Sequence, residues 1–240
     1  MITLGRVEME LGQTKQGHAN MTTNSIPESL SPPETEKGGD TNPPISDAKG
    51  SELIRERGFW KVIREDYHTH RKMALSPGFH AIFVYRFGTW VDTIRFKPLY
   101  AVLNIIWHLA YRWVRNFYGI EMEKTIKAGR RLELGHQHCI VIHANATIGD
   151  DVLIRHNVTF GMGNDWIQGV GPIIGNRVEF SPGVVLVGNV TIGDDVSVGP
   201  NCTVTTNVPS NRTLFVPPPR VMPKQGPPPN LAKNVEPIKT

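Results

Sequence analysis

The chain has 240 residues, which suffice for one substantial domain with appendages but are too few for three. Its net charge is only +4, and its Lys and Arg residues are scattered rather than interleaved with aromatic residues, which argues against a nucleic-acid-binding protein. The two cysteines, Cys139 and Cys202, form no Cys-x-x-Cys pair and no disulfide framework. We expect both to be small, buried side chains.

The N-terminal residues do not resemble a secretion signal, because Arg6, Glu8 and Glu10 stand where an apolar core would be needed. The most apolar stretch, residues 99–109, is too short to span a bilayer and contains Asn104 and His108. We therefore expect a cytoplasmic protein, with the inner face of the membrane as an alternative location.

Composition and periodicity divide the chain into four parts. Residues 1–50 are polar and lack apolar periodicity, which predicts a disordered tail. Residues 51–118 have helical spacing, 119–216 form a repeat region, and 217–240 are a Pro-rich extended tail.

Three helices are expected in the second part. One amphipathic helix runs through Ile54, Trp60 and Ile63, a second begins after Ser76, and a third runs from Lys97 to about residue 113. Basic residues flank the apolar run of the third helix. We favour a partner subunit as the neighbour of residues 98–115, with peripheral membrane contact as the alternative.

The third part repeats every six residues. Two apolar positions per hexad recur along it, with Gly, Asn or Asp between them, as in Ile148-Gly-Asp-Asp-Val and Ile192-Gly-Asp-Asp-Val. A period of six fits neither a helix nor a flat sheet and predicts a β-solenoid, in which three hexads close one triangular coil. The apolar positions are predicted to point inward, and Cys202 occupies one of them.

The period breaks twice. Between Leu132 and Ile142 the chain contains Gly135-His-Gln-His-Cys139, and between Phe160 and Ile174 it contains a Gly-rich segment two residues longer than a whole number of hexads. Functional groups of solenoids are carried on such insertions. We therefore predict the functional site at these breaks.

The chain resembles the serine O-acetyltransferases and their relatives among the hexapeptide-repeat acyltransferases from about residue 63 to 220. The motifs that carry the resemblance are Ile63-Arg-Glu-Asp66, Pro77-Gly-Phe-His-Ala81 with Tyr85-Arg86, Gly119-Ile-Glu121, Gly129-Arg130, Leu134-Gly-His136, Ile148-Gly-Asp-Asp151, Val158-Thr-Phe-Gly161, and Pro218 with Arg220. The resemblance implies a left-handed parallel β-helix, a homotrimer with active sites between subunits, and acetyl-CoA as co-substrate.

The resemblance also assigns roles to residues. The catalytic base of the family falls on His136, and the carboxylate that orients it, an Asp in the family, falls on Glu121. A neutral-range imidazole suits the removal of a proton from an attacking hydroxyl. Coenzyme A is expected along the later coils, near Ser181, Pro182, Gly183, Gly199 and Pro200, with Arg220 near its phosphates.

The departures from the family concern the acceptor. Serine-specific members carry a carboxylate where this chain has Gly135, and an Arg-His pair where it has Val170 and Gly171. Free serine needs charges for both its ammonium and its carboxylate. We therefore expect a saccharide hydroxyl of a surface polysaccharide precursor as acceptor, with Trp166 in the loop, Gly171 and His138 as substrate-binding candidates.

Three alternatives stay open at this point. Serine is the second acceptor, a non-catalytic scaffold is the second class of function, and His138 is the second candidate base. No metal site is expected, because His136, His138 and His143 have no acidic or Cys partner at suitable spacing.

Overall fold

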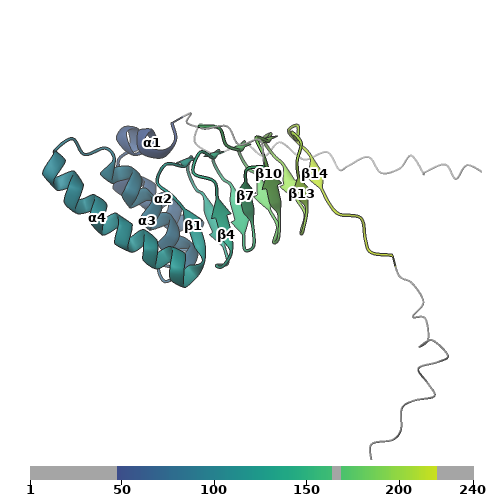
Figure 1. Ribbon diagram of the computed structural model, residues 1–240, viewed down its shortest axis with the longest axis horizontal. Helices are drawn as coiled ribbons and strands as arrows, with labels where there is room; N and C mark the ends of the chain where they lie inside the picture. Colours follow the sequence, from purple (N-terminus) through teal and green to yellow (C-terminus); the bar gives the residue numbers. More distant parts are fainter. Residues whose placement is uncertain (1–47, 164–168, 221–240) are drawn as a thin grey trace, which may run out of the picture. The chain divides into compact units, whose positions relative to one another are not determined.

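The computed structural model describes residues 48–163 and 169–220, and within them four α-helices and one π-helical turn precede fourteen short strands (Figure 1). The helices are α1 (Gly50–Arg57), α2 (Phe59–Thr69), α3 (Pro77–Val91) and α4 (Lys97–Trp113), followed by η1 (Val114–Tyr118). The strands are β1 (Ile120–Met122), β2 (Lys127–Ala128), β3 (Glu133–Gly135), β4 (Ile140–Ile142), β5 (Thr147–Ile148), β6 (Leu153–Arg155), β7 (Thr159–Gly161), β8 (Ile173–Ile174), β9 (Glu179–Phe180), β10 (Val185–Val187), β11 (Thr191–Ile192), β12 (Ser197–Val198), β13 (Thr203–Val204) and β14 (Thr213–Leu214).

The strands wind into a parallel β-solenoid, as the six-residue period predicts. Three sheets form its faces, in the orders β1-β4-β7-β10-β13, β11-β8-β5-β2 and β14-β12-β9-β6-β3. Every third strand therefore lies above its predecessor, and all pairs are parallel. The inward apolar positions predicted from the hexads are all buried, from Ile142 to Val208. Cys202 is buried among them, whereas Cys139 is exposed, so the expectation of a buried side chain is wrong for Cys139.

The register shows how the two breaks are accommodated. Regular coils advance by eighteen residues, as in Thr191 opposite Ile173, but Ile140 pairs with Ile120, twenty residues earlier. The two additional residues lie in the turn between β3 and β4. From β5 to β8 the advance is twenty-six residues, since Thr147 pairs with Ile173. The second break is therefore one hexad plus an eight-residue loop, not two hexads plus two residues.

Polar side chains stack along the corner between the β2 and β3 sheets and explain the repeated Gly-Asp-Asp motif. The Asp150 carboxylate accepts a hydrogen bond from the Arg130 N–H at 2.8 Å, and the Asp150 N–H donates to Asn176 Oδ1 at 2.9 Å. The Asn176 N–H donates in turn to Asp194 at 2.7 Å. The next residue at each corner has a left-handed backbone, with φ 58° at Asp151, a conformation that Asp and Asn tolerate better than most residues.

The helices differ from the expectation at one point. The predicted first helix is divided into α1 and α2 at Gly58, whose φ of 83° interrupts the helix. The second and third helices begin at Pro77 and Lys97 as predicted, each with a proline in its first turn.

Helix α3 closes the first coil of the solenoid and explains two of the family motifs. The Tyr85 hydroxyl donates to the Ile126 carbonyl at 2.7 Å and accepts from the Ala128 N–H at 3.0 Å. Near the start of the helix, a Cβ on Gly78 would lie 2.1 Å from the Leu134 carbonyl oxygen. Only glycine lets α3 approach β3 this closely.

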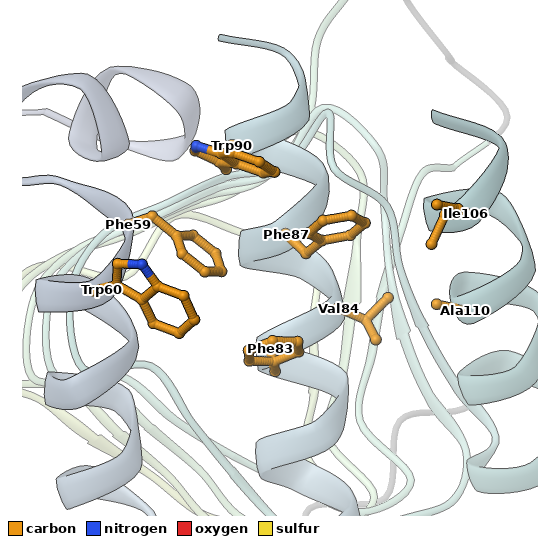
Figure 2. Close-up of a pocket in the computed structure, with 8 residues that line it drawn as sticks. All are labelled: Phe59, Trp60, Phe83, Val84, Phe87, Trp90, Ile106 and Ala110. Carbon is orange, nitrogen blue, oxygen red and sulfur yellow. The ribbon is translucent and has the colours of Figure 1, made fainter. Parts of the chain in front are cut away.

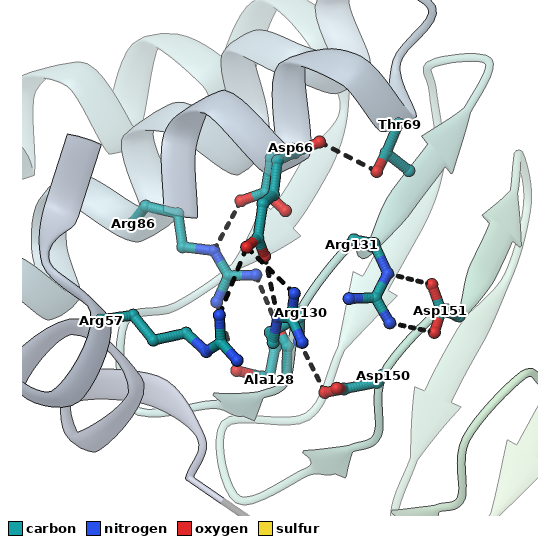
Figure 3. A network of polar contacts seen from close by, with 11 residues as sticks. Arg57, Asp66, Thr69, Arg86, Ala128, Arg130, Arg131, Asp150 and Asp151 are labelled. Carbon is teal, nitrogen blue, oxygen red and sulfur yellow. Dashed lines mark hydrogen bonds and ion pairs between the residues drawn. The ribbon is translucent and has the colours of Figure 1, made fainter. Parts of the chain in front are cut away.

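A buried ion pair fastens α2 and α3 to the same coil (Figure 3). Arg86 Nε donates to the Asp66 carboxylate at 2.8 Å, and its other nitrogens donate to the Ala128 and Gly129 carbonyls. Burial, the largest influence, disfavours the Arg86 cation, but Asp66, Tyr85 and Asp150 together outweigh it, and the pKa of Arg86 is raised. Beside this pair, Arg130 binds Glu65 through two nitrogens. Asp66, Arg86 and Arg130, which belong to the motifs of the family resemblance, thus connect the helices to the first coil. We call this connection the joint between helices and coil.

Candidate functional site

His136 lies in the two-residue expansion of the turn between β3 and β4. Its backbone has φ 72°, His138 has 78° and Cys139 has 54°, three non-glycine residues in the left-handed region within four positions. Such clustering of unfavourable backbone conformations is typical of functional turns. The His136 side chain is exposed, so it is accessible to a substrate.

His156 lies directly beside His136, because β3 pairs with β6 with Gly135 opposite Arg155. The two imidazole rings meet edge to face, with centroids 5.6 Å apart and planes at 82°. His156 Nδ1 is buried and, among the described residues, has no hydrogen-bond partner. The sequence analysis did not single out His156. The sequence spacing could have identified it, since His156 follows His136 by the same twenty residues that separate β1 from β4.

Glu121 lies on the outer face of β1, half-buried and opposite Val141. Its carboxylate faces the end of α4: burial first, and then the charges of Glu121 and Glu123, raise the pKa of Tyr111 to about 12. Within the described part of the chain no hydrogen bond joins Glu121 to His136. The pair expected from the resemblance is therefore not formed in the single chain.

The backbone of His138 is held from both sides, by η1 and by the turn after β6. Its N–H donates to the Tyr118 carbonyl at 2.9 Å, and its carbonyl accepts from the Asn157 N–H at 3.2 Å. A Cβ on Gly119 would lie 3.5 Å from His138 Nδ1, so this ring lies against the start of β1. The His138 ring thus lies against the residue that precedes the strand of Glu121.

A cavity of about 250 Å³ opens beside His136. Side chains of both charges line it: Arg71 from the turn after α2, Glu133 from β3 and Arg155 from β6. Arg155 also lies 3.8 Å from Glu179. Sequence reasoning named none of these three residues. The two arginines could bind an anionic or hydroxyl-rich group, and Glu133 could accept hydrogen bonds from hydroxyls or an ammonium group.

Of the residues expected to hold coenzyme A, those at 181–183 and 199–200 lie on the same edge of the prism as the two histidines, whereas Arg220 follows β14. This edge joins the sheet of β3 to the sheet of β1, and its turns are stacked by backbone hydrogen bonds. The N–H of Asn157 donates to His138, that of Gly183 to His156, and that of Asn201 to Pro182. The turns at 136–139, 156–157, 181–183 and 199–201 therefore form one continuous column.

Glycines keep this column narrow. Gly183 has φ 76°, and a Cβ on it would lie 2.2 Å from Asn201 Oδ1. A Cβ on Gly199 would lie 2.9 Å from the Leu214 carbonyl oxygen. Ser181 and Pro182 are half-buried, while Pro200 and Arg220 are exposed. The turns of this prism edge thus offer apolar proline rings, which suit a pantetheine arm, while Arg220 in the segment after β14 is an accessible cation.

The loop between β7 and β8 leaves the solenoid from the neighbouring corner. Gly171 is buried, and a Cβ on it would lie 2.6 Å from the Asn145 carbonyl group. In the single chain Gly171 therefore serves packing and presents no surface to a substrate. Trp166 lies outside the described residues.

The other histidines are placed differently. His80 Nδ1 is 2.9 Å from the Tyr118 hydroxyl, so His80 packs at the start of α3. His143 is half-buried and its Nδ1 lies 3.3 Å from the Asn145 nitrogen. Over residues 48–163 and 169–220 no group of three or more His, Cys, Asp or Glu side chains could hold a metal ion.

Comparison with known proteins agrees with this architecture. Residues 171–206 match the family model of the bacterial transferase hexapeptide (six repeats). A serine acetyltransferase of Helicobacter pylori is 34% identical over 156 residues, which cover 64% of this chain and 87% of that protein. The putative colanic acid biosynthesis acetyltransferase WcaB of Escherichia coli is 37% identical over 116 residues, 46% of this chain and 70% of that protein.

Solved structures show the same fold. The serine acetyltransferase of Brucella abortus in complex with coenzyme A superposes with a TM-score of 0.58 at 21% identity, covering 72% of both chains. Serine acetyltransferase isoform 3 of Entamoeba histolytica superposes with a TM-score of 0.55 at 21% identity, and this chain spans 63% of its length. The chain is an acetyltransferase and belongs to the hexapeptide-repeat acyltransferases, as a relative of the serine acetyltransferases.

Proposed function

We propose that this protein transfers an acetyl group from acetyl-CoA to a hydroxyl of a saccharide, with His136 as the general base. The observation that carries the proposal is the column of turns on one prism edge. It brings an exposed histidine in a strained turn into line with the narrow glycine and proline turns expected to hold coenzyme A. The relatives named above are acetyltransferases, and one Brucella relative was solved with coenzyme A bound.

The proposed reaction uses the imidazole of His136 twice. Its free ring nitrogen takes the proton of the acceptor hydroxyl as the oxygen attacks the thioester carbonyl. The tetrahedral intermediate then collapses, the carbon–sulfur bond breaks, and the imidazolium returns the proton to the leaving thiolate. In the assembled enzyme Glu121 is proposed to orient the imidazole, which needs the Glu121 side chain to turn from Tyr111 toward His136.

A homotrimer would complete the site. The edge that carries the histidines and the coenzyme A residues is open in the single chain, and a groove requires a second wall. We propose that a neighbouring subunit supplies this wall, and that the enzyme works in the cytoplasm, where acetyl-CoA is available.

The saccharide acceptor is proposed from what lies around His136. The residue before His136 is Gly135, which offers no carboxylate, and the buried Gly171 offers no side chain for an amino acid substrate. The cavity beside His136 is lined instead by Arg71, Glu133 and Arg155. The similarity to WcaB, named as an acetyltransferase of colanic acid biosynthesis, supports an acceptor of this class.

Serine is the second candidate acceptor, and one specific observation favours it. The same cavity contains both a carboxylate, Glu133, and two guanidinium groups, which could bind the two charges of free serine in a different arrangement. The relative from Helicobacter pylori, which the alignment covers to 87%, is named as a serine acetyltransferase.

Thiol release from acetyl-CoA distinguishes these candidates. We expect turnover with a panel of sugars, nucleotide sugars and lipid-linked saccharides that exceeds turnover with serine. His136→Ala should lower kcat by roughly 10²- to 10⁴-fold, the usual contribution of a general base, without loss of coenzyme A binding. His138→Ala is the matched control and should retain most activity.

Each result has a clear consequence. Turnover of serine at or above the best saccharide would replace the saccharide reading. Loss of activity in His138→Ala with retention in His136→Ala would move the base by two residues. Absence of turnover together with absence of coenzyme A binding would leave the scaffold reading.

A further inference from the structure

The end of the molecule that the helices form carries a large apolar surface. A groove of about 580 Å³ runs between α2, α3 and α4 (Figure 2). Eight residues line it, namely Phe59, Trp60, Phe83, Val84, Phe87, Trp90, Ile106 and Ala110. Trp60 at its rim is 75% exposed. A contiguous apolar surface of this kind marks an interaction site in a folded protein.

Helix α4 extends this surface along its whole length. Its exposed apolar residues recur at intervals of three or four and so form one stripe. They are Leu99, Val102, Ile105, Ile106, Leu109 and Trp113, and Phe117 continues the stripe into η1. Ile105 and Leu109 are 61% and 63% exposed, although Trp107 and Tyr111 on the inner side of the same helix are buried. The helix therefore has two apolar sides, of which only one is covered in the chain.

The groove faces away from the solenoid. On α3, Ile82, Tyr85 and Arg86 point toward the first coil, where Tyr85 and Arg86 bind backbone atoms of residues 126–129. Phe83 and Phe87 lie on the opposite side of the helix and line the groove. We call the groove together with the α4 stripe the end surface. The remaining coils rise on the far side of α3, which leaves the end surface free to meet something flat.

The exposed charged side chains along the end surface are mostly basic. Lys61 and Arg64 are exposed on α2, as are Lys97, Arg112 and Arg115 on α4 and η1. The elements α2, α3, α4 and η1 contain two carboxylates, Glu65 and Asp66, and both bind arginines on their inner side. Helix α1, which packs against Phe59 and Trp90 of the groove, also exposes Glu52 and Glu56. The end surface is thus apolar with a rim that is basic along α2, α4 and η1.

We propose that the end surface docks on an anionic phospholipid bilayer. A helix with an apolar side rich in Leu, Ile and Trp, flanked by Lys and Arg, is suited to lie in the plane of a membrane interface. The basic rim fits lipid phosphates, whereas a second copy docked on the same side of α4 would bring the cations of α4 and η1 together, and these two elements contain no carboxylate to neutralise them. No helix in the described ranges could cross the bilayer, so the contact is peripheral.

The proposal is tested with the full chain and vesicles, without any measurement of activity, so its outcome is independent of the proposed function. We expect the protein to float with vesicles of phosphatidylethanolamine and phosphatidylglycerol and not with vesicles of phosphatidylcholine alone. Added salt should release it, because surface charges are screened. Arg112→Ala should weaken binding about fivefold, the effect of one basic residue near an anionic surface.

The apolar part is tested by Ile105→Glu with Leu109→Glu. Both positions are exposed and Glu favours helix, so the fold should be kept, which circular dichroism would verify. We expect vesicle binding to fall at least tenfold, by more than Arg112→Ala lowers it. Phe215→Glu, which changes an equally exposed apolar residue near the other end of the solenoid, is the matched control and should bind as the unaltered chain does.

Two results would overturn the proposal. One is failure of the unaltered chain to bind anionic vesicles. The other is equal binding by the double variant and the unaltered chain. If the double variant also lowered the molecular mass in sedimentation equilibrium, the end surface would be an interface between copies of this chain instead.

Discussion

The ring of His156 stands edge to face with that of His136, 5.6 Å from centroid to centroid, and its own Nδ1 is buried without a hydrogen-bond partner among the described residues. Glu121 forms no hydrogen bond with His136 in this part of the chain, and His156 is the aromatic neighbour against which the proposed base packs. From this relationship we predict a positioning role for His156.

Replacement of His156 tests this role. We expect His156→Gln to lower kcat about tenfold, a loss of about 1.4 kcal/mol of transition-state stabilisation, because the His136 ring loses its packing surface. KM for acetyl-CoA should change little, and the pH dependence of kcat should shift. Thr191→Ala, at an exposed position on β11 away from this edge of the prism, is the control. Unaltered kcat and pH profile in His156→Gln would exclude the role.

The narrow turn at Gly183 gives a prediction for coenzyme A. Gly183→Ala places a Cβ 2.2 Å from Asn201 Oδ1, so the stacked turns must separate. We expect KM for acetyl-CoA to rise about tenfold while kcat changes less, since ground-state binding is lost. Gly188→Ala provides a matched control, because Gly188 also has a positive φ, of 90°, but nothing lies within 4 Å of its Cβ position. Equal effects of the two variants would assign the loss to backbone strain alone.

The joint between helices and coil is tested at Arg86. Arg86→Met leaves the fully buried Asp66 without its cation, and we expect the free energy of unfolding to fall by about 3–5 kcal/mol. The double variant Asp66→Leu with Arg86→Met should recover part of this loss, because no charge remains buried. Urea unfolding would measure both. Arg177→Met, whose partner Asp195 is largely exposed, should cost at most about 1 kcal/mol. If the loss of stability in the double variant equalled the sum of the losses in Arg86→Met and Asp66→Leu, the prediction would be contradicted.

Tyr111 makes stability depend on alkaline pH. Burial and the charges of Glu121 and Glu123 raise the pKa of Tyr111 to about 12, above its ordinary value of 10.0. From pH 10 to about 12 the unfolded chain therefore loses this proton before the folded chain does, and the contribution to stability falls. Below pH 10 it is fully present. Tyr111→Phe should flatten this part of the stability profile. At pH 8 it should cost at most about 1 kcal/mol, since the buried hydroxyl lies near the Arg115 guanidinium but has no well-formed hydrogen bond among the described residues. If the stability of Tyr111→Phe fell between pH 10 and 12 as steeply as that of the unaltered chain, the prediction would be refuted.

The solenoid could be predicted from the sequence because its period is local. Each buried inward residue, such as Ile148 or Val196, occupies the same position in its coil as an apolar residue of the neighbouring coils. The role of His136 stays a prediction: it comes from the family resemblance, and the break in the period only marks the turn in which His136 stands. Arg71 and Arg155 could not be predicted, since they come together only when the turn after α2 folds back beside β6. The break between α1 and α2 was missed because the spacing of apolar residues does not reveal the positive φ of Gly58.

The contact of Gly78 with the Leu134 carbonyl oxygen has a consequence for how the two ends of the enzyme are used. Leu134 is two residues before His136, so His136 lies on the first coil, which rests on the helices. The next coil stacks on this one at a strand spacing of about 4.8 Å. The turns proposed for coenzyme A follow further along the edge, away from the helices. With the end surface on a bilayer, an acceptor held on a lipid carrier would arrive from below and acetyl-CoA from the aqueous side, so that the two substrates would not compete for one entrance.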